Sequence, residues 1–200
     1  MKKSKGKIIL TALALLVVFV LAIGVKLLWF GLPVELHRGM ADYEQRRAEY
    51  PFSEYVLPQT GELPQGASFK YRYRREWIGL FFFAESLLLA VTYDADTYEQ
   101  EKEKLAHRKW LTQELRSGDT DYLIPAHEFY IKSFHFRIPE LREDVADACY
   151  PKSFGMIATS DEKHTIVYLY FYDPEMDYIS EKAGGTEMEG FVRRCFSYWW

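Results

Sequence analysis

Residues 8–32 read IILTALALLVVFVLAIGVKLLWFGL, and this stretch decides how the rest of the chain is organised. Lys26 is its one charged residue. A helix needs about 20 apolar residues to cross the hydrocarbon core of a bilayer. A helix in a soluble core normally keeps a polar face, and none interrupts this run. The sequence therefore predicts a single transmembrane helix over residues 8–32, with the lipid bilayer as its partner.

The far end of this segment has the residues expected at a membrane surface. The aliphatic stem of Lys26 can run along the helix and place its ammonium group at the interface. Trp29 and Phe30 follow where an aromatic belt is common. We expect Lys26, Trp29 and Phe30 to mark the membrane interface.

The charges that flank the segment predict its orientation. Residues 1–7 form a basic tail with four lysines, whereas the flank after residue 32 mixes arginine with glutamate and aspartate. An excess of basic residues marks the cytoplasmic side. We expect a single-pass signal anchor in the cell membrane, with the N-terminus cytoplasmic and the C-terminal domain extracytoplasmic.

A cleaved signal peptide is the alternative to an anchor. Ala22-Ile23-Gly24 has the small-x-small pattern of a cleavage site, and cleavage near Gly24 would give a secreted protein. The apolar run is, however, longer than the usual core of a signal peptide, which is about 7–15 residues. The length of the run favours the anchor.

The composition after Leu32 limits the partners of the domain. This part holds 20 basic and all 29 acidic residues, which gives a formal charge of −9 against −4 for the whole chain. Nucleic-acid binding normally requires clustered positive charge. We expect no nucleic-acid partner.

The pattern after the apolar segment predicts a juxtamembrane helix and linker over residues 33–66 and an α+β domain over residues 67–200. Helical spacing of Leu36, Met40, Tyr43 and Tyr50 predicts the helix between two prolines. Residues 58–66 are rich in Pro and Gly and indicate a turn-rich linker.

Hydrophobic periodicity within the domain predicts a mainly antiparallel sheet of about five strands with three or four helices. Leu87–Val91 and Val167–Phe171 are apolar on both faces, which is typical of central strands. Further strand patterns cover residues 69–74, 129–138 and 154–159, with a bulge expected near Lys132-Ser133. Helices are expected over residues 94–116 and after Pro139 and Asp173, the first capped by Asp96 or Thr97.

The two cysteines, Cys149 and Cys195, allow two interpretations. An extracytoplasmic domain can oxidise them to a disulfide. They can equally be two buried thiols, because the sequence carries no information on the distance between them.

The densest basic cluster consists of Lys70, Arg72, Arg74 and Arg75. On one face of a strand these side chains could bind an anionic polymer or a lipid phosphate. In an acidic domain, a solvated strand face paired with nearby carboxylates is the more common arrangement. Anion binding by this cluster is therefore a hypothesis beside that alternative.

Motifs for a cofactor, a metal ion or a named reaction do not occur in the sequence. Asp173, Glu175 and Asp177 begin like a calcium loop, but Tyr178 and Gly184 occupy the positions of its glycine and its final glutamate. We expect no cofactor and assign no catalytic residue.

The sequence leaves three functions in competition. The first is a membrane-anchored domain that binds or interacts with a partner without catalysis. The second is a membrane-tethered hydrolase acting on envelope material, which would need His127, His135, His164 or a close carboxylate pair in one cleft. The third is an accessory subunit of a membrane complex.

Overall fold

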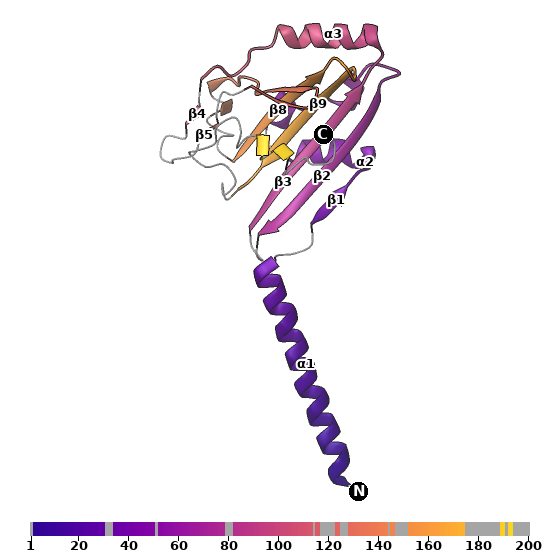
Figure 1. The fold of residues 1–200 in the computed structure, drawn as a ribbon, viewed down its shortest axis with the longest axis vertical. Coiled ribbons are helices and arrows are strands. Elements are labelled where there is room, and N and C mark those ends of the chain that lie inside the picture. The colour runs from indigo at the N-terminus through magenta and orange to yellow at the C-terminus, as the bar shows by residue number, and fades with distance from the viewer. Residues whose placement is uncertain are drawn as a thin grey trace.

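The fold consists of one long N-terminal helix and a domain built on an antiparallel sheet (Figure 1). The coordinates are a computed structural model. The residues it describes are 2–30, 34–50, 52–78, 82–113, 115–116, 123–124, 128–143, 145–146, 152–174, 189–190 and 192–193.

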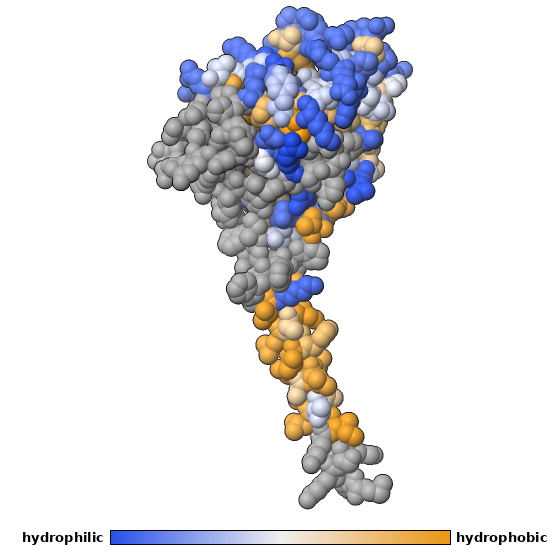
Figure 2. Space-filling view, viewed as in Figure 1, coloured by the Kyte–Doolittle hydropathy of each residue, from blue (hydrophilic) through white to orange (hydrophobic). Residues whose placement is uncertain are grey.

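Helix α1, Lys2–Phe30, stands apart from the domain (Figure 1). Its stretch Ile8–Leu27 has a mean hydropathy of 3.1 over 20 residues and is not buried against the rest of the chain. At 1.5 Å per residue this stretch spans about 30 Å, the thickness of a bilayer core. Figure 2 shows the apolar surface of α1 below a domain whose far end is largely hydrophilic. The helix is thus long and apolar enough for a transmembrane anchor or a signal sequence.

The predicted α+β fold with an antiparallel sheet is confirmed, but the sheet is larger than expected. The described residues form seven strands in one sheet, where about five were predicted. The strand order is β1-β2-β3-β9-β8-β7-β6. The strands are β1 Glu35–His37, β2 Ser68–Ile78, β3 Phe82–Thr92, β6 Phe129–Ile131, β7 Phe134–Arg137, β8 Ser153–Ser160 and β9 Thr165–Tyr172. A separate pair joins β4, Leu115–Arg116, to β5, Leu123–Ile124.

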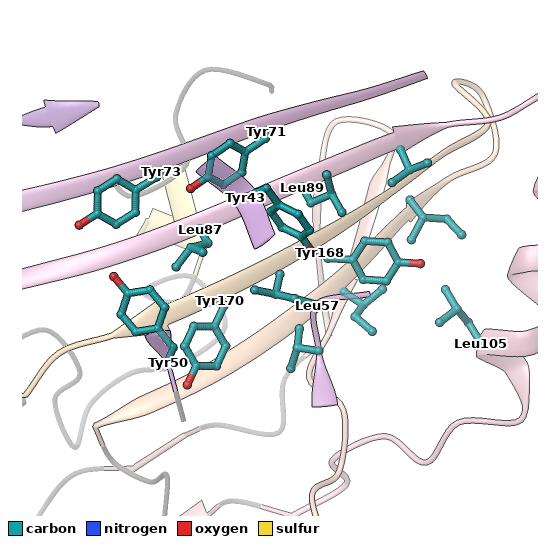
Figure 3. Close-up of a cluster of buried hydrophobic side chains, with 14 of the residues drawn as sticks. Tyr43, Tyr50, Leu57, Tyr71, Tyr73, Leu87, Leu89, Leu105, Tyr168 and Tyr170 are labelled. Carbon is teal, nitrogen blue, oxygen red and sulfur yellow. The ribbon is translucent and has the colours of Figure 1, made fainter. Parts of the chain in front are cut away.

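Strands β3 and β9 lie side by side at the centre of the sheet. Their sequences are apolar on both faces, as expected for strands that are covered on both sides. Alternate side chains enter two cores, one on each face of the sheet. The tyrosine core includes Tyr43, Tyr73 and Tyr170 and is covered by α2 (Met40–Glu49), η1 (Ser53–Tyr55) and α3 (Ala95–Ala106). Figure 3 shows its tyrosines interleaved with Leu57, Leu87 and Leu89. The phenylalanine core on the other face includes Phe134, Phe136 and Phe171.

The predicted juxtamembrane helix is shorter than the sequence indicated. Residues 35–37 form the edge strand β1, and the helix α2 begins only at Met40. Tertiary pairing explains the difference, because Glu35 pairs with Arg75 and β1 forms the strand next to β2 at the edge of the sheet. Further along the chain, η2 (Thr60–Glu62) lies within the turn-rich linker.

The long helix predicted over residues 94–116 ends early. Helix α3 stops at Ala106, and the main chain then pairs Trp110 with Pro139. Asp94 caps the helix by accepting a hydrogen bond from the Thr97 backbone N–H, so neither Asp96 nor Thr97 is the cap. The helix predicted after Asp173 lies mostly outside the described residues.

The expected bulge at Lys132-Ser133 is instead a tight hairpin turn. Ile131 pairs directly with Phe134, which leaves the two intervening residues as the loop. Lys132 has φ of 52°, a left-handed conformation of the kind that tight hairpins require. The break in alternation between residues 131 and 134 was therefore a chain reversal.

Candidate functional site

The basic cluster predicted on β2 is divided between the two faces of the sheet. Lys70, Arg72 and Arg74 alternate along the strand and share one face, whereas Arg75 projects toward the tyrosine core. Arg74 forms an ion pair with Glu76 at 2.9 Å, and Arg75 forms one with Glu85. The four residues therefore do not form a single cationic surface.

Lys70 instead lines a cavity of about 230 Å³ at the end of the sheet near the β8–β9 turn. We call this space the two-lysine cavity. Its lining consists of two lysines, two threonines and three apolar residues: Lys70, Lys163, Thr92, Thr165, Ala90, Phe134 and Val167.

The strand register explains why a cavity lies over this part of the sheet. Lys70, Ala90 and Val167 form one row across β2, β3 and β9. Thr92 and Thr165 form the row beyond it. Because the middle strand contributes only short side chains here, space remains between longer side chains at either side.

The floor and the rim of the cavity differ in polarity. Ala90, Phe134 and Val167 are buried members of the phenylalanine core. Lys70 and Lys163 are exposed at the rim, and the Lys163 ammonium lies 5.0 Å from the centre of the Phe134 ring. That distance is within the range of a cation–π contact. A ligand here would meet an apolar floor and two cationic groups.

The two threonine hydroxyls already donate their protons within the protein. Thr165 donates to the backbone oxygen of Lys163 at 2.8 Å, and its oxygen lies 2.9 Å from the Thr92 hydroxyl. A hydroxyl has one proton, so Thr92 must be the donor in the second bond. In this arrangement the threonines offer only acceptor lone pairs, and the ammonium groups are the donors toward a ligand.

A second polar cluster lies on the tyrosine face around the buried carboxylate of Glu85, which is 2% exposed. Tyr50 donates to it at 2.5 Å and Tyr73 at 2.7 Å, and Arg75 Nε donates at 2.5 Å. Burial raises the pKa of both tyrosines, and their hydrogen bonds to Glu85 add to the effect. Both carboxylate oxygens accept hydrogen bonds from these donors, so the cluster ties β2, β3 and the end of α2 together.

The histidines named as candidates for hydrolysis do not meet in the described structure. His135 contacts Glu128 at 2.8 Å and stacks on Tyr130, while His164 lies against Tyr98. His127 lies outside the described residues. The part of the chain that the structure describes contains no cluster of three His, Cys, Asp or Glu side chains suited to a metal ion.

The cysteine pair and most of the loop that begins like a calcium site are not covered by the structure. Cys149 and Cys195 lie outside the described residues, as do Glu175 and Asp177. Asp173 is buried, and its backbone N–H donates to the Lys152 oxygen.

The membrane-interface residues lie on α1. Lys26 is exposed near the end of the helix, and Trp29 and Phe30 occupy its last turn. The contact of these three residues with the membrane interface stays a prediction.

Two arrangements of side chains escaped the sequence reasoning. Lys163 and the threonine pair join Lys70 only through the register of β2, β3 and β9. Tyr50 and Glu85 meet across 35 positions of sequence. Neither arrangement has a local sequence signature.

Comparison with models of protein families, with curated proteins and with solved structures finds no match for this chain.

Proposed function

We propose that this chain is a single-pass membrane protein whose extracytoplasmic domain binds a small anionic ligand in the two-lysine cavity. Helix α1 supplies the anchor, and the basic tail before it favours a cytoplasmic N-terminus. The observation that carries the binding proposal is the convergence of Lys70 and Lys163, 93 positions apart in sequence, on one apolar-floored cavity.

The lining defines the chemistry of the ligand. Two ammonium groups favour a carboxylate or a phosphate, because charge-assisted hydrogen bonds are the stronger kind. The floor of Ala90, Phe134 and Val167 favours a short apolar body. The volume of about 230 Å³ is below the usual range for drug-sized ligands, which points to a small molecule.

The lining groups suit binding rather than hydrolysis. The two lysines can hold and orient an anion, and the lining includes no histidine or carboxylate that could activate a threonine hydroxyl or a water molecule. The proposal is therefore one of a binding module.

Calorimetric titration of the full chain in detergent micelles tests the proposal. Butyrate and inorganic phosphate are the anionic probes, and butyramide is the uncharged control for butyrate. We expect at least one anion to bind saturably, and Lys70→Ala and Lys163→Ala each to weaken binding by about tenfold or more, because each removes a charge-assisted hydrogen bond.

Lys109→Ala is the matched control, since Lys109 is also exposed but does not line the cavity. Its affinity should equal that of the unmodified chain. Butyramide binding as tightly as butyrate, or Lys109→Ala weakening anion binding as much as Lys163→Ala, would contradict the proposal. So would the lack of saturable binding by either anion.

A further inference from the structure

We infer that the Trp77–Ile78 end of β2 and the Phe82–Phe83 start of β3, together called the hairpin tip, form a second membrane contact in the bilayer interface beside the end of α1. The inference rests on α1 as the anchor and is independent of the two-lysine cavity. It is carried by strand register, by the residues at the tip and by the position of α1.

The register places this hairpin near the end of the anchor. Helix α1 ends at Phe30 and β1 begins at Glu35, so at most five peptide units, about 18 Å, separate them. Glu35 then pairs with Arg75 of β2. The end of β2 is thus held within a short linker's reach of the membrane.

The antiparallel pairing directs the tip back toward α1. Strand β1 leads away from the anchor, and β2 runs the opposite way beside it. From Arg75, β2 continues three residues to Ile78, about 10 Å farther. Figure 1 shows the end of β2 and the start of β3 at the side of the domain toward α1.

The composition changes sharply along the hairpin. Up to the pair Glu76–Ala84 the strands carry charged residues, but from residue 77 to residue 83 the sequence reads WIGLFFF. Trp77 pairs with Phe83, and Ile78 with Phe82. A run with tryptophan, phenylalanine and no charge suits the membrane interface, whereas charged residues suit the aqueous side.

The described side chains at this boundary form an ordered group. Trp77 and Phe83 are half-buried, and their ring centres lie 5.4 Å apart. The Arg75 guanidinium lies 5.1 Å from the centre of the Phe83 ring and is itself held by Glu85. The buried carboxylate therefore fixes the arginine, and the arginine supports the aromatic pair that faces the membrane.

The negative charge of the domain indicates that insertion of apolar side chains, and not attraction to anionic lipid, drives this contact. The chain after Leu32 has a formal charge of −9, which an anionic surface would repel. Arg74 and Arg75 are both engaged with glutamates. Contact should therefore depend little on the charge of the lipid headgroups.

Photocrosslinking of the full chain in phosphatidylcholine nanodiscs tests the inference. A benzophenone amino acid replaces Trp77 or, in a second variant, Phe83. Phe69 is the matched control, because it is an exposed aromatic residue at the opposite end of β2. A fourth variant carries the benzophenone at Val18 of α1, which is 62% exposed, and tests whether α1 itself contacts lipid. We expect lipid adducts at positions 18, 77 and 83, at least about tenfold above position 69.

The outcomes separate the hairpin from the anchor. Adducts at position 18 with none above the Phe69 level at positions 77 and 83 would overturn the inference and leave the anchor in place. No adduct at position 18 would overturn both. Crosslinked dimers of the chain from position 77, in place of lipid adducts, would assign the tip to a second copy and overturn the inference.

A change of lipid tests the apolar nature of the contact. Replacing part of the phosphatidylcholine with phosphatidylglycerol should change the adduct yield at position 77 by less than about twofold. A much larger rise would show that headgroup charge drives the contact and would overturn the apolar mechanism.

Discussion

Gly155 shows at the scale of single residues how closely β8 approaches the segment after η1. A Cβ built on Gly155 would lie 2.9 Å from Val56 Cβ and nearer still to both Val56 methyl groups. Real Cβ atoms do not approach so closely, and Val56 is itself only 4% exposed. The glycine is therefore required by packing, in a core dense enough to resist one added methyl group.

Gly155→Ala should lower the free energy of unfolding by about 1–3 kcal/mol, because the added methyl group overpacks the tyrosine core. Chemical denaturation measures the change. Adding Val56→Ala should recover part of the loss, since it removes the clashing methyl groups. Gly61→Ala, which meets nothing within 4 Å, is the control and should be nearly neutral. Equal losses for Gly155→Ala and Gly61→Ala would refute this packing account.

The Glu85 cluster gives a second prediction at this scale. Glu85→Gln should cost about 3 kcal/mol of stability, because it leaves the Arg75 guanidinium without its buried counter-charge. Glu76→Gln removes a carboxylate from an ion pair that is 39% exposed on the glutamate side, and should change stability by less than about 0.5 kcal/mol. Denaturant melts that give the two variants the same stability would show that the cluster is not structural.

At the scale of elements, the sequence predicts what periodicity controls and misses what tertiary pairing controls. The doubly apolar runs of β3 and β9 identified the central strands, because burial on both faces leaves no polar alternation. Strand β1 was missed because three residues carry no detectable period, and only pairing with β2 makes them a strand. The sequence identified only one lysine of the two-lysine cavity. Lys70 was part of the predicted basic cluster, whereas Lys163 is brought to the cavity by the β8–β9 turn.

The β8–β9 turn also fastens α3 to the sheet, and this link should depend on pH. Asp161 in the turn accepts hydrogen bonds from Lys102 and Tyr98 of α3, at 2.7 and 2.6 Å. The Lys102 hydrogen bond, followed by that from Tyr98, lowers the pKa of Asp161 below its ordinary 3.8. A carboxyl with a lowered pKa stabilises the fold above its unfolded pKa, and this stabilisation is lost as the pH falls through the folded pKa.

The stability difference between the unmodified chain and Asp161→Asn should therefore be constant near neutral pH. It should shrink as the pH falls below 3.8, where the carboxyl becomes protonated in the native protein as well. The effect should be small, because the Asp161 side chain is 69% exposed. Urea melts across acidic and neutral pH measure it, and a difference that does not vary with pH would rule out this role for the ionised carboxylate.

At the scale of the whole molecule, charge and hydropathy are separated along the long axis. Helix α1 carries the apolar surface and the basic tail, and all acidic residues lie beyond it in the chain. The aromatic hairpin tip lies at the end of the domain toward α1, and the two-lysine cavity lies at the opposite end of the same sheet. The two proposed contacts, with the membrane and with a ligand, would therefore lie at opposite ends of the domain.

Reporter fusions at the C-terminus in a bacterial host test the central claim, an anchored domain outside the cytoplasm, most directly. Alkaline phosphatase folds into its active form only outside the cytoplasm, and green fluorescent protein exported in the unfolded state stays dark. We expect an active phosphatase fusion that stays in the membrane fraction, and a dark fluorescent-protein fusion. An inactive phosphatase fusion with a bright fluorescent-protein fusion would contradict the orientation, and an active phosphatase released in soluble form would contradict the anchor.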